Sequence, residues 1–265
     1  MDIVAVKIGG SLITKKDKPF TIDLDAIERF AVEIDTFLSM KDRKEQLILV
    51  HGGGSFSHTV ASSYISKINS LPELDYGFIL ISAAARDLNT KIIKALLDYG
   101  IRAFPLESSA IIIKQSNSLS LSQTALITKV LEMGWVPVFY GDVIVDSING
   151  ECKILSGEEI LRLLAFNIPL KKIVVLTDTN GVLRDTNDPN STIDHIDQQT
   201  LKKYIDSIGP SNNKDVTGGM IHKVQILLDI ANQKGVKSFI VNGKNQGSLL
   251  RAINGDHIAG TYIGD

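Results

Sequence analysis

The stretch QLILVHGGGSFSH (residues 46–58) joins a short apolar run to three successive glycines and ends in a second histidine, His58. The apolar run, bounded by polar residues and glycine, predicts a buried strand. Glycine lets the backbone approach a ligand closely, and bare N–H groups at the start of a helix bind anions. A flexible turn is the simpler alternative. We interpret the stretch as a strand that ends in a phosphate-binding loop.

Short apolar runs of this kind alternate with longer amphipathic segments along the chain. The pattern predicts strands at residues 3–8, 47–50, 136–140, 173–177 and 239–241, and helices at residues 24–40, 74–99, 123–133, 158–166, 198–208 and 219–234. Strands separated by helices of this length form parallel crossover units. We therefore expect an α/β fold, a three-layer αβα sandwich with a mainly parallel central sheet.

Two further features concern organisation. Ser-Ile-Asn-Gly at residues 147–150 separates two strand-like runs, 143–145 and 152–155, and predicts an antiparallel hairpin. No linker-like stretch divides the chain. We place the boundary between two lobes near residue 170, which gives lobes of residues 1–170 and 171–265 on one continuous sheet.

The composition is typical of a soluble globular protein, with 44% hydrophobic and 22% charged residues among 265. A formal net charge of −2 excludes a basic field for nucleic acid or an anionic membrane. Cys152 is the single cysteine, so an internal disulfide framework and a cysteine-rich metal site are excluded. No secretory signal is visible, and no apolar run approaches the roughly twenty residues that span a bilayer. We expect a cytoplasmic protein.

Glycines and lysines recur just after the predicted strands, where ligands bind in an open parallel sheet. Each such segment alone fits an ordinary turn, an Asx turn or a helix cap. Together they predict a phosphate-transfer site, in which lysines neutralise phosphate oxygens. Neither G-x-x-x-x-G-K-[ST] nor G-x-G-x-x-G is present. The segments are Lys7, Gly9, Gly10 and Ser11 with Lys15 and Lys16; residues 52–54; Gly141 and Gly157; residues 177–181; and Gly218, Gly219 and Lys223.

Six motifs occur in the order and spacing of the amino acid kinase superfamily: KIGGSLITKK (7–16), HGGGSFSH (51–58), VPVFYGDVIVD (136–146), ILSGEEI (154–160), LTDTNGVL (176–183) and DVTGGMIHK (215–223). The sequence resembles that superfamily over essentially its whole length, which implies the amino acid kinase fold. Within it, the sequence is most similar to the archaeal type of isopentenyl phosphate kinases, because phosphate- and phosphonate-accepting members look similar in carrying a histidine at the position of His58.

This resemblance implies ATP-dependent phosphorylation of isopentenyl phosphate to isopentenyl diphosphate, a step of isoprenoid biosynthesis by an alternative mevalonate pathway. It places the acceptor in the N-terminal lobe and the nucleotide in the C-terminal lobe. Mg²⁺ is expected with ATP, held mostly by phosphates and water, so no protein ligand is named. No general base is required, because the acceptor phosphate oxygen is already anionic near neutral pH.

The resemblance also implies roles for individual residues. The catalytic residues are Lys7, Lys16 and His58. Acceptor binding falls to Gly53, His58 and Gly157. ATP binding falls to a larger set that follows the strands: Lys7, Gly9, Gly10, Ser11, Gly54, Asp178, Gly218, Gly219 and Lys223.

A five-carbon isoprenyl tail requires an apolar slot, since each buried CH₂ contributes about 0.8 kcal/mol. One face of the predicted helix 74–99 has i, i+3, i+4, i+7 spacing and carries Phe78, Ile81, Ser82 and Ala85. We predict that these four residues bind the tail, with the small pair Ser82 and Ala85 leaving spare volume. Plain core packing is the alternative.

Two positions depart from the family pattern. Ser57 stands where the family usually has glycine, so its side chain is expected to narrow the acceptor site or to bond to the acceptor phosphate. Glu158 and Glu159 stand where an aspartate pair is usual. The first carboxylate of relatives orients the active-site lysines, and Glu158 keeps that charge on a side chain one methylene longer.

Other functions stay open at this point. A fosfomycin or other phosphonate kinase of the same fold would share the His58 loop, and a polar acceptor pocket would favour it. A nucleotide-binding protein without turnover is a further alternative, although Lys7, Lys16 and Lys223 favour catalysis. Relatives are commonly dimers, so we expect a homodimer that binds small-molecule substrates and neither nucleic acid nor a membrane.

Overall fold

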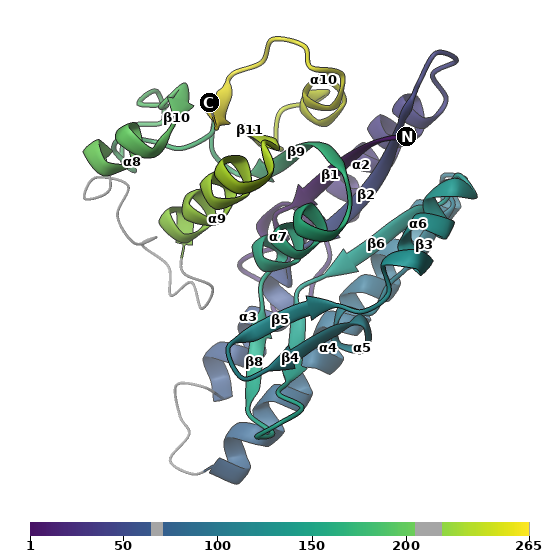
Figure 1. Ribbon diagram of the computed structural model, residues 1–265, viewed down its shortest axis with the longest axis vertical. Coiled ribbons are helices and arrows are strands. Elements are labelled where there is room, and N and C mark those ends of the chain that lie inside the picture. Colours follow the sequence, from purple (N-terminus) through teal and green to yellow (C-terminus); the bar gives the residue numbers. More distant parts are fainter. Residues whose placement is uncertain (65–70, 205–218, 265) are drawn as a thin grey trace.

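The computed structural model describes residues 1–64, 71–204 and 219–264 (Figure 1). Its centre is an eight-stranded sheet. All neighbouring strands are parallel except β11 (Lys237–Asn242) and β12 (Gly260–Ile263). The mainly parallel sheet is therefore confirmed. Its order across the sheet is β10 (His195–Ile196), β12, β11, β9 (Leu170–Thr177), β1 (Asp2–Ile8), β2 (Glu45–His51), β6 (Val136–Tyr140) and β3 (Ala103–Pro105).

Helices cover both faces of this sheet, because the side chains of its central strands are apolar on both sides (Figure 1). Val4 and Val6 face one hydrophobic cluster, whereas Ile3 and Ala5 face the other. The Val4 side packs against α1 (Gly10–Ile13), α2 (Leu24–Leu38), α3 (Gly54–Tyr64), α4 (Leu71–Asp98) and α10 (Ser248–Asn254). The Ile3 side packs against α5 (Ser108–Ile111), α6 (Thr124–Glu132), α7 (Gly157–Asn167), α8 (Gln198–Tyr204) and α9 (Gly219–Lys234). The three-layer αβα sandwich is confirmed.

Two small antiparallel sheets leave the central one. β7 (Asp142–Val145) and β8 (Cys152–Leu155) form the hairpin that the sequence predicts. A second pair, β4 (Ile112–Gln115) and β5 (Ser118–Leu121), was not predicted. An ion pair between Lys114 and the buried Asp146 ties the two hairpins together. The first hairpin was predictable because its turn has a sequence signature, whereas β4 and β5 are too short for a periodic pattern.

Helix ends follow local chemistry. The Asp23 side chain accepts a hydrogen bond of 3.2 Å from the Ala26 amide and caps α2. Gly100, Gly134 and Gly235 adopt positive φ just past helix ends, which other residues rarely do. The predicted helix 198–208 begins as α8, but its residues 205–208 lie outside the described ones.

The sheet runs without a break across residue 170. β9 pairs with β1 from Ile3 to Ile8, so strands from both halves of the chain share one hydrogen-bond ladder. The division into lobes of residues 1–170 and 171–265 stays a prediction. Within the described ranges, no helix combines the length and the apolar character needed to cross a membrane.

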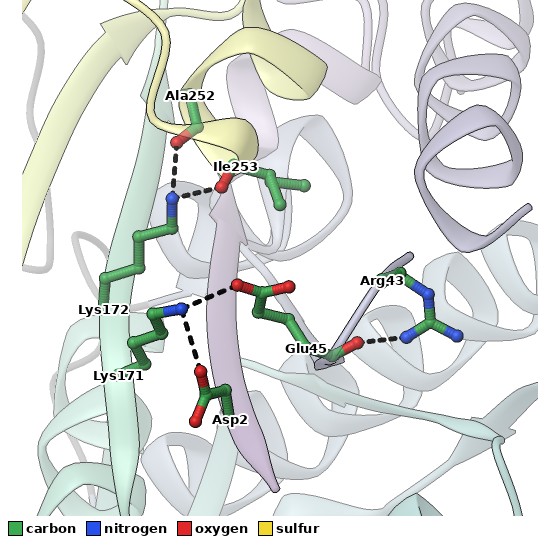
Figure 2. Close-up of polar contacts among 7 residues, drawn as sticks. All are labelled: Asp2, Arg43, Glu45, Lys171, Lys172, Ala252 and Ile253. Carbon is green, nitrogen blue, oxygen red and sulfur yellow. Dashed lines mark hydrogen bonds and ion pairs between the residues drawn. The ribbon is translucent and has the colours of Figure 1, made fainter. Parts of the chain in front are cut away.

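At the amino ends of the strands, two neighbouring lysines stabilise the fold (Figure 2). The ammonium group of Lys171 lies 2.9 Å from a carboxylate oxygen of Asp2 and 2.7 Å from one of Glu45, and so links β9 to β1 and β2. Lys172 points the other way and donates to the carbonyls of Ala252 and Ile253 in the last turn of α10. A cation is favourable there because the carbonyls at a helix end are unpaired. Burial lowers the pKa of Lys172.

We expect the Lys172→Met variant to be less stable than the wild type by about 1 kcal/mol, because Met keeps the apolar stem but removes the hydrogen-bond donor. In thermal unfolding this corresponds to a Tm lower by about 2–4 °C. Lys171→Met is the matched control, since its ion pairs are solvent-exposed and screened. An equal or larger fall in Tm for Lys171→Met would contradict the assignment.

Candidate active site

The loops that follow three neighbouring strands start side by side at the carboxyl edge of the sheet. Ile8 at the end of β1 is in register with His51 of β2 and with Leu176 of β9. The Gly9 amide donates to the Leu176 carbonyl at 3.0 Å, and the Gly52 amide donates to the Ile8 carbonyl at 3.1 Å. The edge where ligands bind in open α/β sheets therefore carries the predicted glycine loops.

The loops after β1 and β2 touch through their backbones. A Cβ added to Gly10 would lie 2.2 Å from the Gly54 nitrogen, and one added to Gly54 would lie 2.6 Å from the Gly10 carbonyl oxygen. Gly54 also has a φ of 48°, which disfavours side chains. Only glycine fits at these two positions, so the predicted donor and acceptor loops form a single junction.

Thr14 joins the two sides of this junction; it lies within the motif KIGGSLITKK, but no role is predicted for it from the sequence alone. Its hydroxyl donates to the Gly10 carbonyl at 2.8 Å and accepts from the Ser55 amide at 2.8 Å. One side chain thus joins the helix that follows β1 to the helix that follows β2. A threonine four residues after a glycine is too common in sequences to mark such a contact.

Two lysines and a glutamate form a buried cluster beside the junction. The Lys7 ammonium lies 2.7 Å from Glu158 Oε1, and Lys223 contacts the same oxygen. The exposed fractions of the three side chains are 9% for Lys7, 7% for Glu158 and 14% for Lys223. Glu158 therefore occupies the position of a carboxylate that orients both lysines, despite its extra methylene.

Strand alternation explains why Lys7 reaches this cluster. Lys7 follows Ile3 and Ala5 at a spacing of two residues, so its side chain lies on the sheet face that packs against α7 and α9. Glu158 lies in the first turn of α7, and Lys223 lies in the second turn of α9. A Cβ on Gly157 would come 3.1 Å from Lys7 Cε, which shows how closely α7 covers the lysine.

Charge and burial oppose one another in this cluster. Burial by itself would raise the pKa of Glu158, but the charges and hydrogen bonds of Lys223 and Lys7 outweigh burial and hold that pKa well below its usual range. Burial lowers the pKa of Lys7, and Lys223 adds to this effect while Glu158 opposes it. One carboxylate faces two ammonium groups, so the cluster favours an anionic ligand such as phosphate.

The start of α7 positions Glu158. Ser156 caps the helix by accepting a hydrogen bond of 3.1 Å from the Glu159 amide, and the Glu159 carboxylate accepts one of 2.9 Å from the Ser156 amide. This capping box points Glu159 back at its own helix and leaves Glu158 free to face the lysines. The two glutamates thus have different roles.

Lys16 and Asp178 form a second pair at the same edge. The Lys16 ammonium lies 2.6 Å from Asp178 Oδ2, and both side chains are partly exposed. Burial would raise the pKa of Asp178, but the hydrogen bond and charge of Lys16 lower it. Lys16 follows α1 and Asp178 follows β9, so this pair lies between the loops of the two predicted lobes.

The residues predicted to bind the acceptor make fewer contacts with the rest of the site than the lysines do. His58 is exposed on α3, one turn after Gly54, and no hydrogen bond or ion pair among the described residues joins it to the lysine cluster. Gly53 immediately precedes α3. Gly219 opens α9 with a φ of 69°, whereas Gly218 lies outside the described residues. The binding roles of these residues stay predictions.

The residues predicted for the isoprenyl slot are mostly packed in the core. Ile81 and Ala85 are 2% and 1% exposed, and Phe78 packs against the same cluster from its border. The Ser82 hydroxyl donates to Asp142 Oδ1 at 2.7 Å, which links α4 to the hairpin β7–β8. The isoprenyl slot stays a prediction. In the structure, Ile81 and Ala85 are buried in the core.

The His51 side chain connects the glycine loop to α4. Its Nε2 lies 3.0 Å from the Asn89 amide nitrogen, and its Nδ1 lies 3.1 Å from the Gly52 carbonyl. An amide donor at Nε2 and a carbonyl at Nδ1 together select the neutral tautomer with hydrogen on Nδ1. The ring also stacks on Tyr140 at 5.7 Å. These contacts make His51 a structural residue.

The open sheet carries glycine loops and buried lysines at its carboxyl edge, an arrangement that suits phosphoryl transfer by positioning and charge neutralisation. The chain belongs to the amino acid kinase family, whose sequence profile matches residues 2–242. It is similar to the isopentenyl phosphate kinases of Methanocaldococcus jannaschii, at 33% identity over 268 residues, and of Methanothermobacter thermautotrophicus, at 34% over 273 residues. Each alignment covers 98% of both chains. A crystal structure of isopentenyl phosphate kinase, 32% identical, matches with a TM-score of 0.81 and covers 98% of this chain and 99% of that one.

Replacing Glu158 with Gln removes the counter-ion of two buried lysines and keeps the size of the side chain. We expect phosphoryl transfer to fall at least tenfold and the free energy of unfolding to fall by about 3–5 kcal/mol, as for other broken buried ion pairs. ATP turnover and denaturant unfolding measure the two effects. Glu159→Gln is the control, because glutamine keeps the capping box and the ion pair that it removes, with the exposed Lys153, contributes little. Wild-type turnover in Glu158→Gln would contradict the role given to this carboxylate.

Burial lowers the pKa of His51 to about 4. The unfolded chain takes up this proton near pH 6.5, so the stability that His51 confers is complete above that pH and is lost as pH falls toward 4. The loss amounts to about 3 kcal/mol over this window. We expect His51→Gln to unfold with a weaker dependence on pH between 7 and 5. Parallel curves for the wild type and the variant, measured by urea unfolding, would show that His51 titrates normally.

Proposed function

We propose that this protein transfers the terminal phosphoryl group of ATP to isopentenyl phosphate and releases isopentenyl diphosphate. The observation that carries the proposal is the buried Lys7–Glu158–Lys223 cluster beside the junction of the two glycine loops. Membership in the amino acid kinase family supports the reaction type. Relatives named isopentenyl phosphate kinase, aligned over nearly the whole chain, support the acceptor.

The chemistry follows from charge and position. Among the described residues, no hydrogen bond joins the amides of Gly10, Ser11 and Gly54 to an acceptor, so these amides are available to phosphate oxygens where Gly10 meets Gly54. Lys7 and Lys223 neutralise the charge that spreads over the transferring group. Lys16 reaches the same edge from the end of α1. The acceptor phosphate attacks directly, because its oxygen is already anionic.

Mg²⁺ enters this scheme with the nucleotide. Among the described residues, no group of three His, Cys, Asp or Glu side chains could hold a metal ion. Mg²⁺ usually keeps several waters and binds through phosphates with one or two carboxylates. When bound, it would neutralise the phosphates of ATP. Asp178 is the acidic side chain that follows β9 at this edge, and it is paired with Lys16.

On the acceptor side, Gly53, His58 and Gly157 hold the phosphate of isopentenyl phosphate. The face of α4 that carries Phe78 and Ser82 lies toward the isoprenyl tail of the same substrate. By analogy with relatives, the protein forms a homodimer. Its proposed location is the cytoplasm. Light scattering after size-exclusion chromatography measures the oligomeric state.

A substrate panel tests the function. We expect ATP consumption with isopentenyl phosphate and little with fosfomycin or without an acceptor. His58→Ala should raise KM for isopentenyl phosphate at least tenfold and leave KM for ATP nearly unchanged, because a hydrogen bond to a charged phosphate contributes about 1.5–3 kcal/mol. The exposed His257, changed to Ala, is the matched control.

Each alternative has its own outcome in this panel. Turnover with fosfomycin alone would assign the protein to the phosphonate kinases. ATP binding without turnover for any acceptor would make it a nucleotide-binding protein. An unchanged acceptor KM in His58→Ala would remove the imidazole from the site while leaving the reaction type intact.

A further inference from the structure

Ser57 carries a hydroxyl group that the fold leaves unsatisfied. Its Oγ is buried and has no hydrogen-bond partner among the residues that the structure describes. The side chain lies against Gly53: a Cβ on that glycine would come 2.3 Å from Ser57 Oγ and 2.5 Å from Ser57 Cβ. The hydroxyl is therefore packed onto the glycine that directly precedes α3, beside the junction with Gly10.

Other hydroxyls on α3 behave differently. Thr59 donates to the Ser55 carbonyl at 2.6 Å, and Ser62 donates to the Thr59 carbonyl at 3.1 Å. Such bonds to the preceding turn are the usual way in which a helix satisfies these side chains. For Ser57 the carbonyl four residues earlier belongs to Gly53, which already accepts from the amides of Phe56 and Ser57 at 3.2 Å each.

An unpaired buried hydroxyl is destabilising, and native proteins retain few such groups. A protein can nevertheless retain an unpaired buried hydroxyl if a ligand supplies the hydrogen-bond acceptor when it binds. The surroundings favour an anion: Ser57 stands in the first turn of an 11-residue helix, where the helix dipole is positive. No acidic side chain bonds to residues 52–57 within the described chain, so nothing there competes with a phosphate.

We propose that the Ser57 hydroxyl donates a hydrogen bond to the phosphate of the acceptor, which makes Ser57 a specificity-determining residue of this chain. The inference rests on the proposed function and adds a side-chain donor to the amides of Gly53 and Gly54. The competing interpretation is steric: Ser57 narrows the site by its bulk alone. Alanine and glycine separate the two, because both lack the hydroxyl but only glycine also lacks the Cβ.

The experiment compares wild type, Ser57→Ala, Ser57→Gly and the control Ser62→Ala in steady-state kinetics with ATP and isopentenyl phosphate. Binding of inorganic phosphate by calorimetry and thermal unfolding without ligand complete the set. We expect Ser57→Ala and Ser57→Gly alike to raise the acceptor KM and to weaken phosphate binding about tenfold or more, with KM for ATP unchanged. Without ligand, Ser57→Ala should unfold at the wild-type Tm or above it, since an unpaired group has been removed.

Two results would overturn the inference. Wild-type acceptor KM and phosphate affinity in Ser57→Ala, with a change in Ser57→Gly alone, would assign Ser57 a purely steric role. A lower Tm for Ser57→Ala with unchanged phosphate affinity would mean that the hydroxyl is satisfied inside the protein by a buried water. Failure of the proposed function is distinguishable, because it would appear as no turnover of isopentenyl phosphate by the wild type, while phosphate calorimetry would still test Ser57.

Discussion

Backbone-to-backbone contact between Gly10 and Gly54 is the constraint on which the rest of the site depends. The loops after β1 and β2 can touch only because neither residue has a side chain. The parallel register of the two strands brings the loops to the same height, and Thr14 fastens them with two hydrogen bonds. Two helix starts therefore meet at one point, where the amides of Gly10 and Gly54 have no hydrogen-bond partner among the described residues. A phosphoryl donor and an anionic acceptor can meet there without a covalent intermediate.

In the proposed reaction, the lysine cluster supplies full positive charge close to the transferring group, which bare amides cannot supply. Burying Lys7 and Lys223 is unfavourable unless both are paired, and a single oxygen of Glu158 contacts both. The capping box of α7 fixes that oxygen by committing Glu159 to the helix start. The helix cap thus positions the Glu158 carboxylate between the two lysines.

The polar side chains at the two edges of the sheet differ in the kinds of contact that they make. At the amino edge, Lys171 pairs with carboxylates on two neighbouring strands of the sheet, and Lys172 donates to carbonyls of α10 and so joins the sheet to that helix (Figure 2). At the carboxyl edge, two ammonium groups share one carboxylate, and the Ser57 hydroxyl has no hydrogen-bond partner in the part of the chain that the structure describes. Satisfied polar groups stabilise a fold, whereas a buried hydroxyl without a partner beside a junction of loops is a group that a ligand can satisfy.

The sequence by itself determined the layer architecture, the central strands and the long helices, because apolar periodicity, glycine ends and caps such as Asp23 act over a few residues. It also pointed to Lys7, Gly10, Gly54 and Lys223 through family motifs. Only the tertiary structure decided that Glu158 meets Lys7, that Thr14 joins two helices and that Ile81 and Ala85 pack in the core. Lys7 and Glu158 are 151 residues apart, so their contact depends on strand order and on the covering helix. Neither the strand order nor the position of the covering helix produces a local sequence pattern, because the packing of the whole sheet determines which distant segments pair.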